Sequence, residues 1–166
     1  MTSAAELREI AATSLGVPVA AAGVFAADVS LLTRAAGGAA AGEAADALGL
    51  GTSAAVDGVA AAAGMQMAQE AGAQAEGLTG VMLVAVTQRD IVLMDWQGNS
   101  AAGSGTTRVL ASFPREGTRV EESKLGATRK VTLTGPDRTV TISGGMGLLS
   151  RGKQGKRDVL EALGLE

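Results

Sequence analysis

The composition of this chain changes abruptly at Gly80. Between Ala35 and Gly77 the chain consists almost wholly of alanine, glycine and a few acidic residues, with no aromatic residue and no proline. From Val81 onward it is rich in Val, Leu, Ile and Thr, starting with the segment VMLVAVTQRDIVLMDW. Alanine favours helices, whereas β-branched residues favour strands. The sequence therefore predicts a compact β module that carries a helical appendage.

The residue types that are missing narrow the available chemistry. The 166 residues include no His, Cys or Tyr. Without cysteine there is no disulfide and no thiolate-ligated metal, and without histidine there is no Ser-His-Asp or Cys-His arrangement. An all-oxygen magnesium or calcium site remains open, although no segment resembles a calcium-binding loop. We expect a protein that is not an enzyme and holds no cofactor or metal.

Charge is distributed unevenly along the chain. Residues 1–79 carry two basic and eight acidic side chains, a net charge of −6, whereas residues 80–166 carry twelve basic and nine acidic ones, a net charge of +3. This basic excess is small, and no aromatic residues alternate with the bases to form a stacking platform. We expect no nucleic-acid partner.

The N-terminal residues predict one helix and one strand. Thr2 or Ser3 can cap the helix; Ser3 lies three residues before Glu6, the spacing of a capping box, and the helix should end near Leu15-Gly16. Residues 17–25, VPVAAAGVF, then predict a strand. The uncharged run from Ile10 to Ala27 approaches the minimum length of a membrane span, but it is mostly alanine and glycine. Because the start is also not basic, we expect a cytoplasmic protein, with peripheral attachment to a membrane left open.

Two helices are predicted in the tract of alanine and glycine, over about residues 39–48 and 53–75. Small residues recur there at four-residue spacing, which lets two helices approach closely. A genomic bias toward alanine and glycine would give the same composition, so both interpretations stay open. The candidate helix-association surface consists of Gly38, Gly42, Val56, Val59, Ala60, Ala63 and Gly64.

Short apolar segments after Gly80 predict an antiparallel meander. Residues 81–87 and 91–96 form a hairpin around Gln88-Arg89-Asp90, and residues 98–105 form a loop. The closing segment RDVLEALG predicts an amphipathic helix. Further strands are predicted at residues 108–113, with Val109, Ala111 and Phe113 on one face, and at residues 119–125, 130–134 and 139–143.

The predicted hairpin is apolar on both faces, since Val81–Val86 and Ile91–Met94 do not alternate with polar residues. A strand pair with one face in water should alternate. We therefore expect a second layer over the outer face, formed by the helices of the tract. Trp96, the one tryptophan, is expected to lie in the core and close the hairpin.

The hairpin VMLVAVTQRDIVLMDW and the closing segment KRDVLEALG resemble the pleckstrin-homology-like superfold in its bacterial forms, the short PH or GRAM-like domains. Bacterial members often have a Thr-x-Arg turn between two apolar strands, which Thr87-Gln88-Arg89 matches. The resemblance covers residues 80–163 and implies an α+β fold, a PH-like antiparallel β meander or barrel closed by a C-terminal helix. The expected layout is an N-terminal helix and first strand in residues 1–34, an Ala/Gly-rich helical hairpin in residues 35–79 and the β module in residues 80–166.

This family implies a binding module rather than an enzyme. Some relatives bind acidic lipids through basic residues in the loop that joins their first two strands. In this chain the acidic tract stands at that position. We therefore do not expect phosphoinositide binding by the usual route.

Two candidate motifs precede the closing helix. Gly147–Lys153 matches the pattern G-x-x-x-x-G-K, but Gln154 stands where a phosphate-binding loop needs Ser or Thr to hold magnesium. That loop also requires parallel strands, whereas the turns here indicate antiparallel ones, so we expect no nucleotide site. The candidate contact with an anionic ligand or membrane consists of Arg151, Lys153, Lys156 and Arg157, and a solvated basic loop is the alternative.

Two classes of function remain open from the sequence. The first is a non-catalytic binding module that docks on a partner protein or a membrane surface. The second is a structural, self-assembling subunit in which the Ala/Gly helices form the contact between copies.

Overall fold

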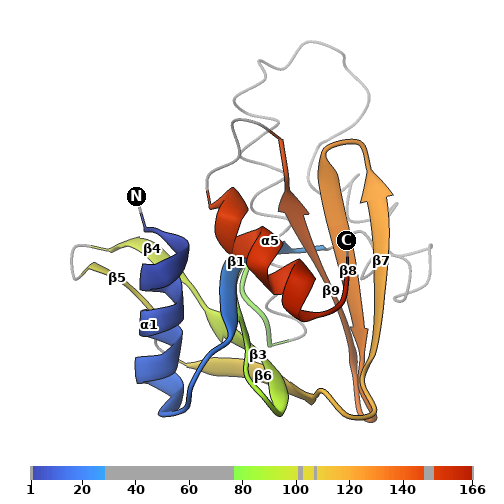
Figure 1. Cartoon of the computed structure of the whole chain (residues 1–166), viewed down its shortest axis with the longest axis horizontal. Helices are drawn as coiled ribbons and strands as arrows, with labels where there is room; N and C mark the ends of the chain where they lie inside the picture. The colour runs from blue at the N-terminus through green and yellow to red at the C-terminus, as the bar shows by residue number, and fades with distance from the viewer. Residues whose placement is uncertain (1, 29–76, 101–102, 107, 148–151, 166) are drawn as a thin grey trace, which may run out of the picture.

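The computed structural model describes residues 2–28, 77–100, 103–106, 108–147 and 152–165. In this part of the chain the fold is α+β: an open antiparallel sheet with strand order β6-β3-β2-β1-β9-β8-β7, one N-terminal helix and one C-terminal helix (Figure 1). The helices are α1 (Ala4–Leu15) and α5 (Lys153–Ala162). The sheet strands are β1 (Ala21–Ala27), β2 (Val81–Val86), β3 (Asp90–Asp95), β6 (Val109–Pro114), β7 (Arg119–Leu125), β8 (Thr128–Thr134) and β9 (Thr139–Gly145).

Helix α1 begins and ends where the sequence predicts. The Ser3 hydroxyl accepts a hydrogen bond from the Glu6 backbone N–H, and the Glu6 carboxylate accepts one from the Ser3 backbone N–H, which together form the capping box. The helix ends at Gly16, whose φ of 67° lies in the left-handed region that glycine tolerates best.

Strand β1 is the first strand of the sheet in chain order, and it begins four residues later than the sequence predicts. It pairs with β2 from Ala21↔Val86 to Ala26↔Val81, so residues 28–80 connect two neighbouring antiparallel strands. At the end of β1, Asp28 forms an ion pair with Lys130 of β8, with 2.6 Å between Oδ2 and Nζ. The predicted helices of the Ala/Gly tract lie outside the described residues.

The turn between β2 and β3 is built on the hydroxyl of Thr87. That oxygen accepts hydrogen bonds from the backbone N–H groups of Arg89 and Asp90, at 3.3 and 2.9 Å. The guanidinium that reaches this turn belongs to Arg115, which donates to the Thr87 carbonyl at 3.2 Å. The same side chain donates to the Ala162 carbonyl at 2.8 Å, so Arg115 joins the hairpin to the end of α5.

Two expectations for the next segment are wrong. The predicted loop contains a small hairpin, β4 (Gln97–Ser100) paired with β5 (Gly103–Gly105). Val109 does not share a face with Ala111 and Phe113, because the register shifts between Leu93 and Met94. This bulge places Val109 opposite Met94, where 52% of Val109 is exposed.

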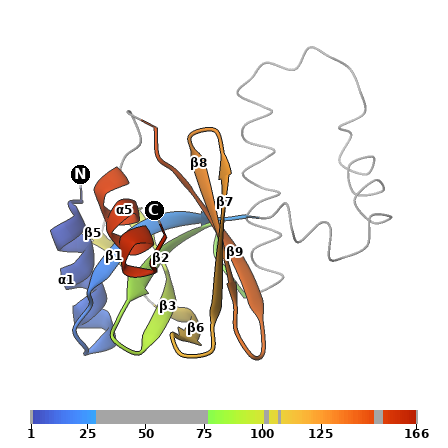
Figure 2. The same ribbon diagram turned by 45° about the vertical axis from the view of Figure 1, so that its right-hand side comes forward.

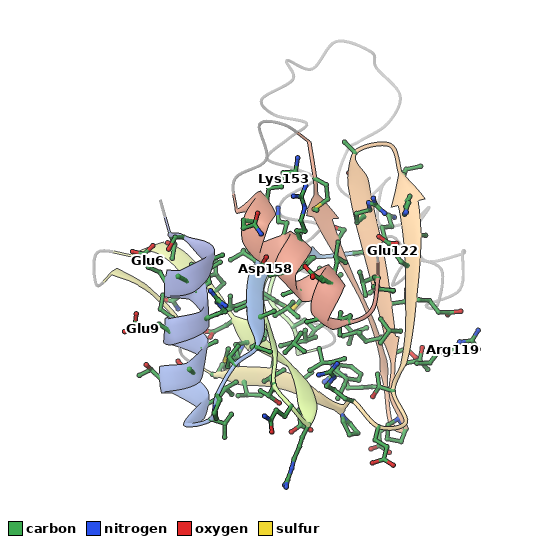
Figure 3. The ribbon with its side chains drawn as sticks, in the orientation of Figure 1. Glu6, Glu9, Arg119, Glu122, Lys153 and Asp158 are labelled. Atoms are coloured by element: carbon green, nitrogen blue, oxygen red, sulfur yellow. The ribbon has the colours of Figure 1, made fainter. Side chains whose placement is uncertain are left out.

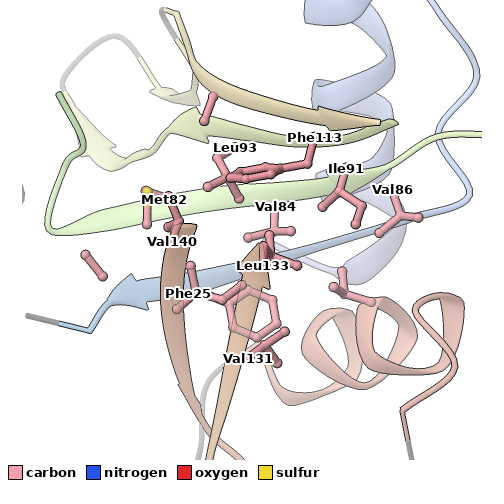
Figure 4. Packing of buried hydrophobic residues seen from close by; sticks show 14 of the residues in the cluster. Phe25, Met82, Val84, Val86, Ile91, Leu93, Phe113, Val131, Leu133 and Val140 are labelled. Carbon is pink, nitrogen blue, oxygen red and sulfur yellow. The ribbon is translucent and has the colours of Figure 1, made fainter. Parts of the chain in front are cut away.

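The main core lies between the two halves of the sheet. Figure 4 shows its side chains from β1, β2, β3 and β6 meeting those from β8 and β9, and α5 adds Val159 and Leu160. As predicted, the inward residues of β8 and β9 are Val131, Leu133, Val140 and Ile142, all of them buried.

Helix α1 covers the outer face of the β2–β3 hairpin. Leu7 and Ala11 pack there in a second cluster with Leu83, Ala85, Val92 and Met94, and half-buried Trp96 lies against the same cluster. Among the described residues the cover over these side chains is α1, which the sequence did not predict; the Ala/Gly tract, which was expected there, lies outside the described residues.

Helix α5 closes the gap between the two halves of the sheet. In the described part of the chain, β9 pairs with β1 only at Ala26 and Ala27, and α5 packs along the remainder of β1 (Figure 2). The contact is made by glycine on both sides: a Cβ at position 23 would lie 2.7 Å from the Gly155 carbonyl carbon. The two backbones can approach this closely because neither residue has a side chain.

Candidate functional site

A row of basic side chains crosses from the sheet onto α5. On β7 and β8, Lys124 is paired in register with Arg129, and Arg129 is paired with Gly144 of β9. Register partners in a sheet point to the same face. Gly144 faces Phe25 and Lys156, so Lys124 and Arg129 lie on the face that α5 partly covers.

Lys156 continues this row from the helix. A Cβ added at Gly144 would lie 3.1 Å from the Cδ atom of Lys156, so the aliphatic chain of this lysine fills the space above that glycine. Its ammonium group donates to the Gly145 carbonyl at 3.3 Å. Burial lowers the pKa of the Lys156 ammonium group, because desolvation disfavours the charged form.

Among the described residues, Glu122 is an acidic side chain within the row. Glu122 accepts a hydrogen bond from the Arg129 guanidinium at 2.8 Å and lies 3.9 Å from the Lys124 ammonium group. Its side chain is 11% exposed, whereas that of Lys124 is 56% exposed. The carboxylate therefore holds Arg129 in place and leaves Lys124 accessible to solvent.

Helix α5 segregates its charges on two sides. Lys153 and Lys156 are three residues apart and lie on one side of the helix, and Arg157, four residues from both Lys153 and Glu161, lies between that side and the acidic one. Asp158 accepts a hydrogen bond from the Gln154 amide at 2.6 Å, and together with Glu161 it lines a cleft against Arg8 of α1. Figure 3 shows Lys153 at the start of α5 and Asp158 nearer to α1. Lys156 thus faces β9, whereas Asp158 and Glu161 face α1.

The start of α5 strengthens the positive potential of this region. Its first turn contains no acidic residue, and its N-cap, Gly152, offers no side-chain cap. The free N–H groups at a helix start carry the positive end of the helix dipole. We call the surface formed by Lys124, Arg129, Lys153, Lys156 and Arg157 the basic row.

The structure places some of the predicted contact residues and not others. Lys153, Lys156 and Arg157 all belong to α5, whereas Arg151 lies outside the described residues. Lys124 and Arg129 were not predicted from the sequence; two charged strands joined by a short turn were the signal that could have indicated them. The candidate helix-association surface, Gly38, Gly42, Val56, Val59, Ala60, Ala63 and Gly64, lies wholly outside the described residues.

The glycine-rich segment before α5 does not have the setting of a phosphate-binding loop. Strand β9, which precedes it, is antiparallel to both of its neighbours, β1 and β8. A phosphate-binding loop follows a strand of a parallel βαβ unit. Gln154, at the position of the magnesium-holding hydroxyl, donates its amide to Asp158.

A metal cluster and a membrane-spanning helix are both absent from the described ranges. Among those residues no three His, Cys, Asp or Glu side chains come together in a way that could hold a metal ion. Neither described helix has the length and apolar character needed to cross a membrane.

Comparison with known proteins gives no match. No protein-family model, no curated protein and no solved structure is significantly similar to this chain.

Proposed function

We propose that this chain is a non-catalytic, PH-like binding module that docks on an anionic membrane surface through the basic row. The observation that carries the proposal is the meeting of Arg129 of β8 and Lys156 of α5 at Gly144, with Lys124 beside Arg129 on β7 and with Lys153 and Arg157 on the same helix as Lys156. An antiparallel sheet completed by a C-terminal helix supports the PH-like assignment.

The form of the basic row favours an extended partner over a small molecule. Its side chains are spread across three elements, and several are solvent-accessible. Two clefts in the described part of the chain lie elsewhere: about 370 Å³ between α1 and α5, and about 320 Å³ beside the β2–β3 turn. A bilayer of anionic lipids presents many phosphates over a wide area, and each nearby Lys or Arg contributes on the order of 1 kcal/mol to attachment.

Vesicle flotation tests this function. The chain should float with vesicles that contain anionic lipid and remain behind with neutral vesicles, and its attachment should weaken as salt is raised. The triple variant Lys124→Gln, Lys153→Gln, Arg157→Gln should lower the partition coefficient about 100-fold, since about 1 kcal/mol per charge is roughly fivefold.

A matched variant controls for net charge. Arg8→Gln, Arg89→Gln, Arg108→Gln removes three exposed basic side chains from other parts of the described surface. It should attach like the wild type. Equal loss in both triple variants, or no attachment of the wild type to anionic vesicles, would overturn the proposal and leave an acidic protein partner as the alternative.

The self-assembling subunit remains a prediction of the sequence. It depends on the Ala/Gly tract, which lies outside the described residues. Light scattering of the full chain tests it, because an assembly and a monomer differ in mass.

A further inference from the structure

We propose that the β7–β8 turn inserts into the bilayer, with Leu125 as the side chain that enters the apolar layer. This inference rests on the proposed function and adds to it the orientation of the protein on the membrane. Three features of the turn support this insertion: its exposed leucine, its position at the basic end of the molecule and the lysine beside it.

Leu125 is the most exposed large apolar side chain in the described part of the chain. It is 69% exposed, compared with 52% for Val109 and 45% for Val17 and Val81. A single exposed leucine is ordinary on a protein surface. Its location therefore decides whether it has a role.

The β7–β8 turn lies against the connection that leads to α5. The Met146 backbone N–H donates to the Ala127 carbonyl at 2.7 Å, and a Cβ at Gly147 would lie 3.8 Å from the Ala127 methyl group. Figures 1 and 2 show the turn, the end of β9 and the start of α5 at the same end of the molecule. Leu125 therefore lies at the end of the molecule that carries the basic row, and, as the strand neighbour of Lys124, it points to the opposite face of the hairpin.

The backbone of the turn has open space around it. Gly126 has a φ of +58°, and a Cβ there would meet no atom within 4 Å. Lys124, directly before Leu125, has a side chain that is 56% exposed. A leucine at the tip can enter the region of the acyl chains while the adjacent ammonium group reaches lipid phosphates, as in other interfacial segments.

A membrane fits this arrangement better than an acidic protein. An acidic protein surface complements the bases but offers an isolated leucine nothing unless it also has a matching pocket. An anionic bilayer supplies phosphates and an apolar layer side by side at every point of its surface. The occupant to which the proposal commits is therefore a bilayer that contains anionic lipid.

Serine substitution measures the contribution of the leucine. Leu125→Ser should lower the partition coefficient on anionic vesicles about tenfold, the effect of withdrawing most of one leucine side chain from an apolar layer. Val109→Ser is the matched control, because β6 and β7 form opposite edges of the sheet, and it should attach like the wild type. Leu125 and Val109 are both exposed, so both variants should melt at the wild-type temperature.

A fluorescent label reports insertion directly. The chain has no cysteine, so Leu125→Cys and Val109→Cys each provide one site for a nitrobenzoxadiazole label. The emission maximum of the label at position 125 should shift to shorter wavelength on anionic vesicles, and that of the label at position 109 should not. A label at position 125 that stays in water while the protein floats would overturn the insertion and leave the proposed function standing. If the protein does not float at all, both proposals fail.

Discussion

The contact between Gly23 and Gly155 sets the distance between α5 and β1, and single methyl groups can test it. A Cβ at position 23 would lie 2.7 Å from both the carbonyl carbon and the carbonyl oxygen of Gly155, and 2.8 Å from the Lys156 nitrogen. A Cβ at position 155 would lie 2.6 Å from the Ala22 carbonyl oxygen. These are backbone atoms, so no side chain can rotate away and the helix itself must move.

The size of the effect follows from these distances. Ordinary contact begins at 3.4 Å, so Gly23→Ala must push α5 away by about 0.7 Å. Val159 and Leu160, both buried, would lose part of their packing against the core. Overpacking of this kind costs typically about 1–3 kcal/mol. We expect Gly23→Ala to lower the free energy of unfolding by about 2 kcal/mol, and Tm by about 4–8 °C.

Gly155→Ala should cost less than Gly23→Ala. Alanine stabilises a helix by about 1 kcal/mol relative to glycine, which offsets part of the same clash. The double variant should lose less stability than the sum of the single variants, because once α5 has moved, the second methyl group meets less resistance.

Urea denaturation at equilibrium measures these differences. Gly105→Ala is the control, since a Cβ at Gly105 would meet no atom within 4 Å, and its stability should match the wild type. The reasoning would be refuted if Gly23→Ala unfolded at the wild-type urea concentration, or if the two single effects simply added in the double variant.

Three other predictions follow from single contacts. Thr87→Val should lower stability by about 1–3 kcal/mol because it leaves the N–H of Asp90 without its acceptor, whereas Thr87→Ser should be close to neutral in the same urea assay. Lys156→Met should keep the packing over β9 and remove a charge that burial disfavours, so stability should hold or rise while attachment to anionic vesicles falls about fivefold. Hydrogen bonds from the Ser3 backbone and hydroxyl lower the pKa of Glu6 in the folded protein. The stabilisation they give is therefore present above pH 4.5 and lost as pH falls through the lower folded pKa. Ser3→Ala should make Tm fall less over this acidic range, which thermal melts recorded across pH measure.

The parts of the fold that the sequence predicts well depend on neighbouring residues. The capping box needs only Ser3 and Glu6, three residues apart, and the β2–β3 turn needs only Thr87 and the residues up to Asp90. Inward-facing positions on β8 and β9 follow from alternation over a few residues. Each of these features is decided within one turn or one strand.

The parts that the sequence misses depend on residues far apart in the chain. The exposure of Val109 comes from a bulge in its pairing with β3, which no local alternation reveals. In the described part of the chain the cover over the β2–β3 hairpin comes from α1, and no local pattern in either segment indicates that this helix meets these strands. Lys124 joins the basic row through three strands: it pairs with Arg129 of β8, Arg129 pairs with Gly144 of β9, and Lys156 of α5 lies over Gly144.

The proposed binding surface therefore depends on the core as much as on its own charges. Helix α5 holds Lys156 toward β9 and its acidic side toward α1, and the glycine contact with β1 fixes how closely it lies. If α5 moves outward, Lys156 loses its place over Gly144 and its hydrogen bond to the Gly145 carbonyl, while Lys124 and Arg129 stay on the sheet. The row would then divide into two weaker clusters, and attachment to a membrane would fall although no charge had been removed. Gly23→Ala, which lies outside the basic row, thus links the packing of the core to the function proposed for the surface.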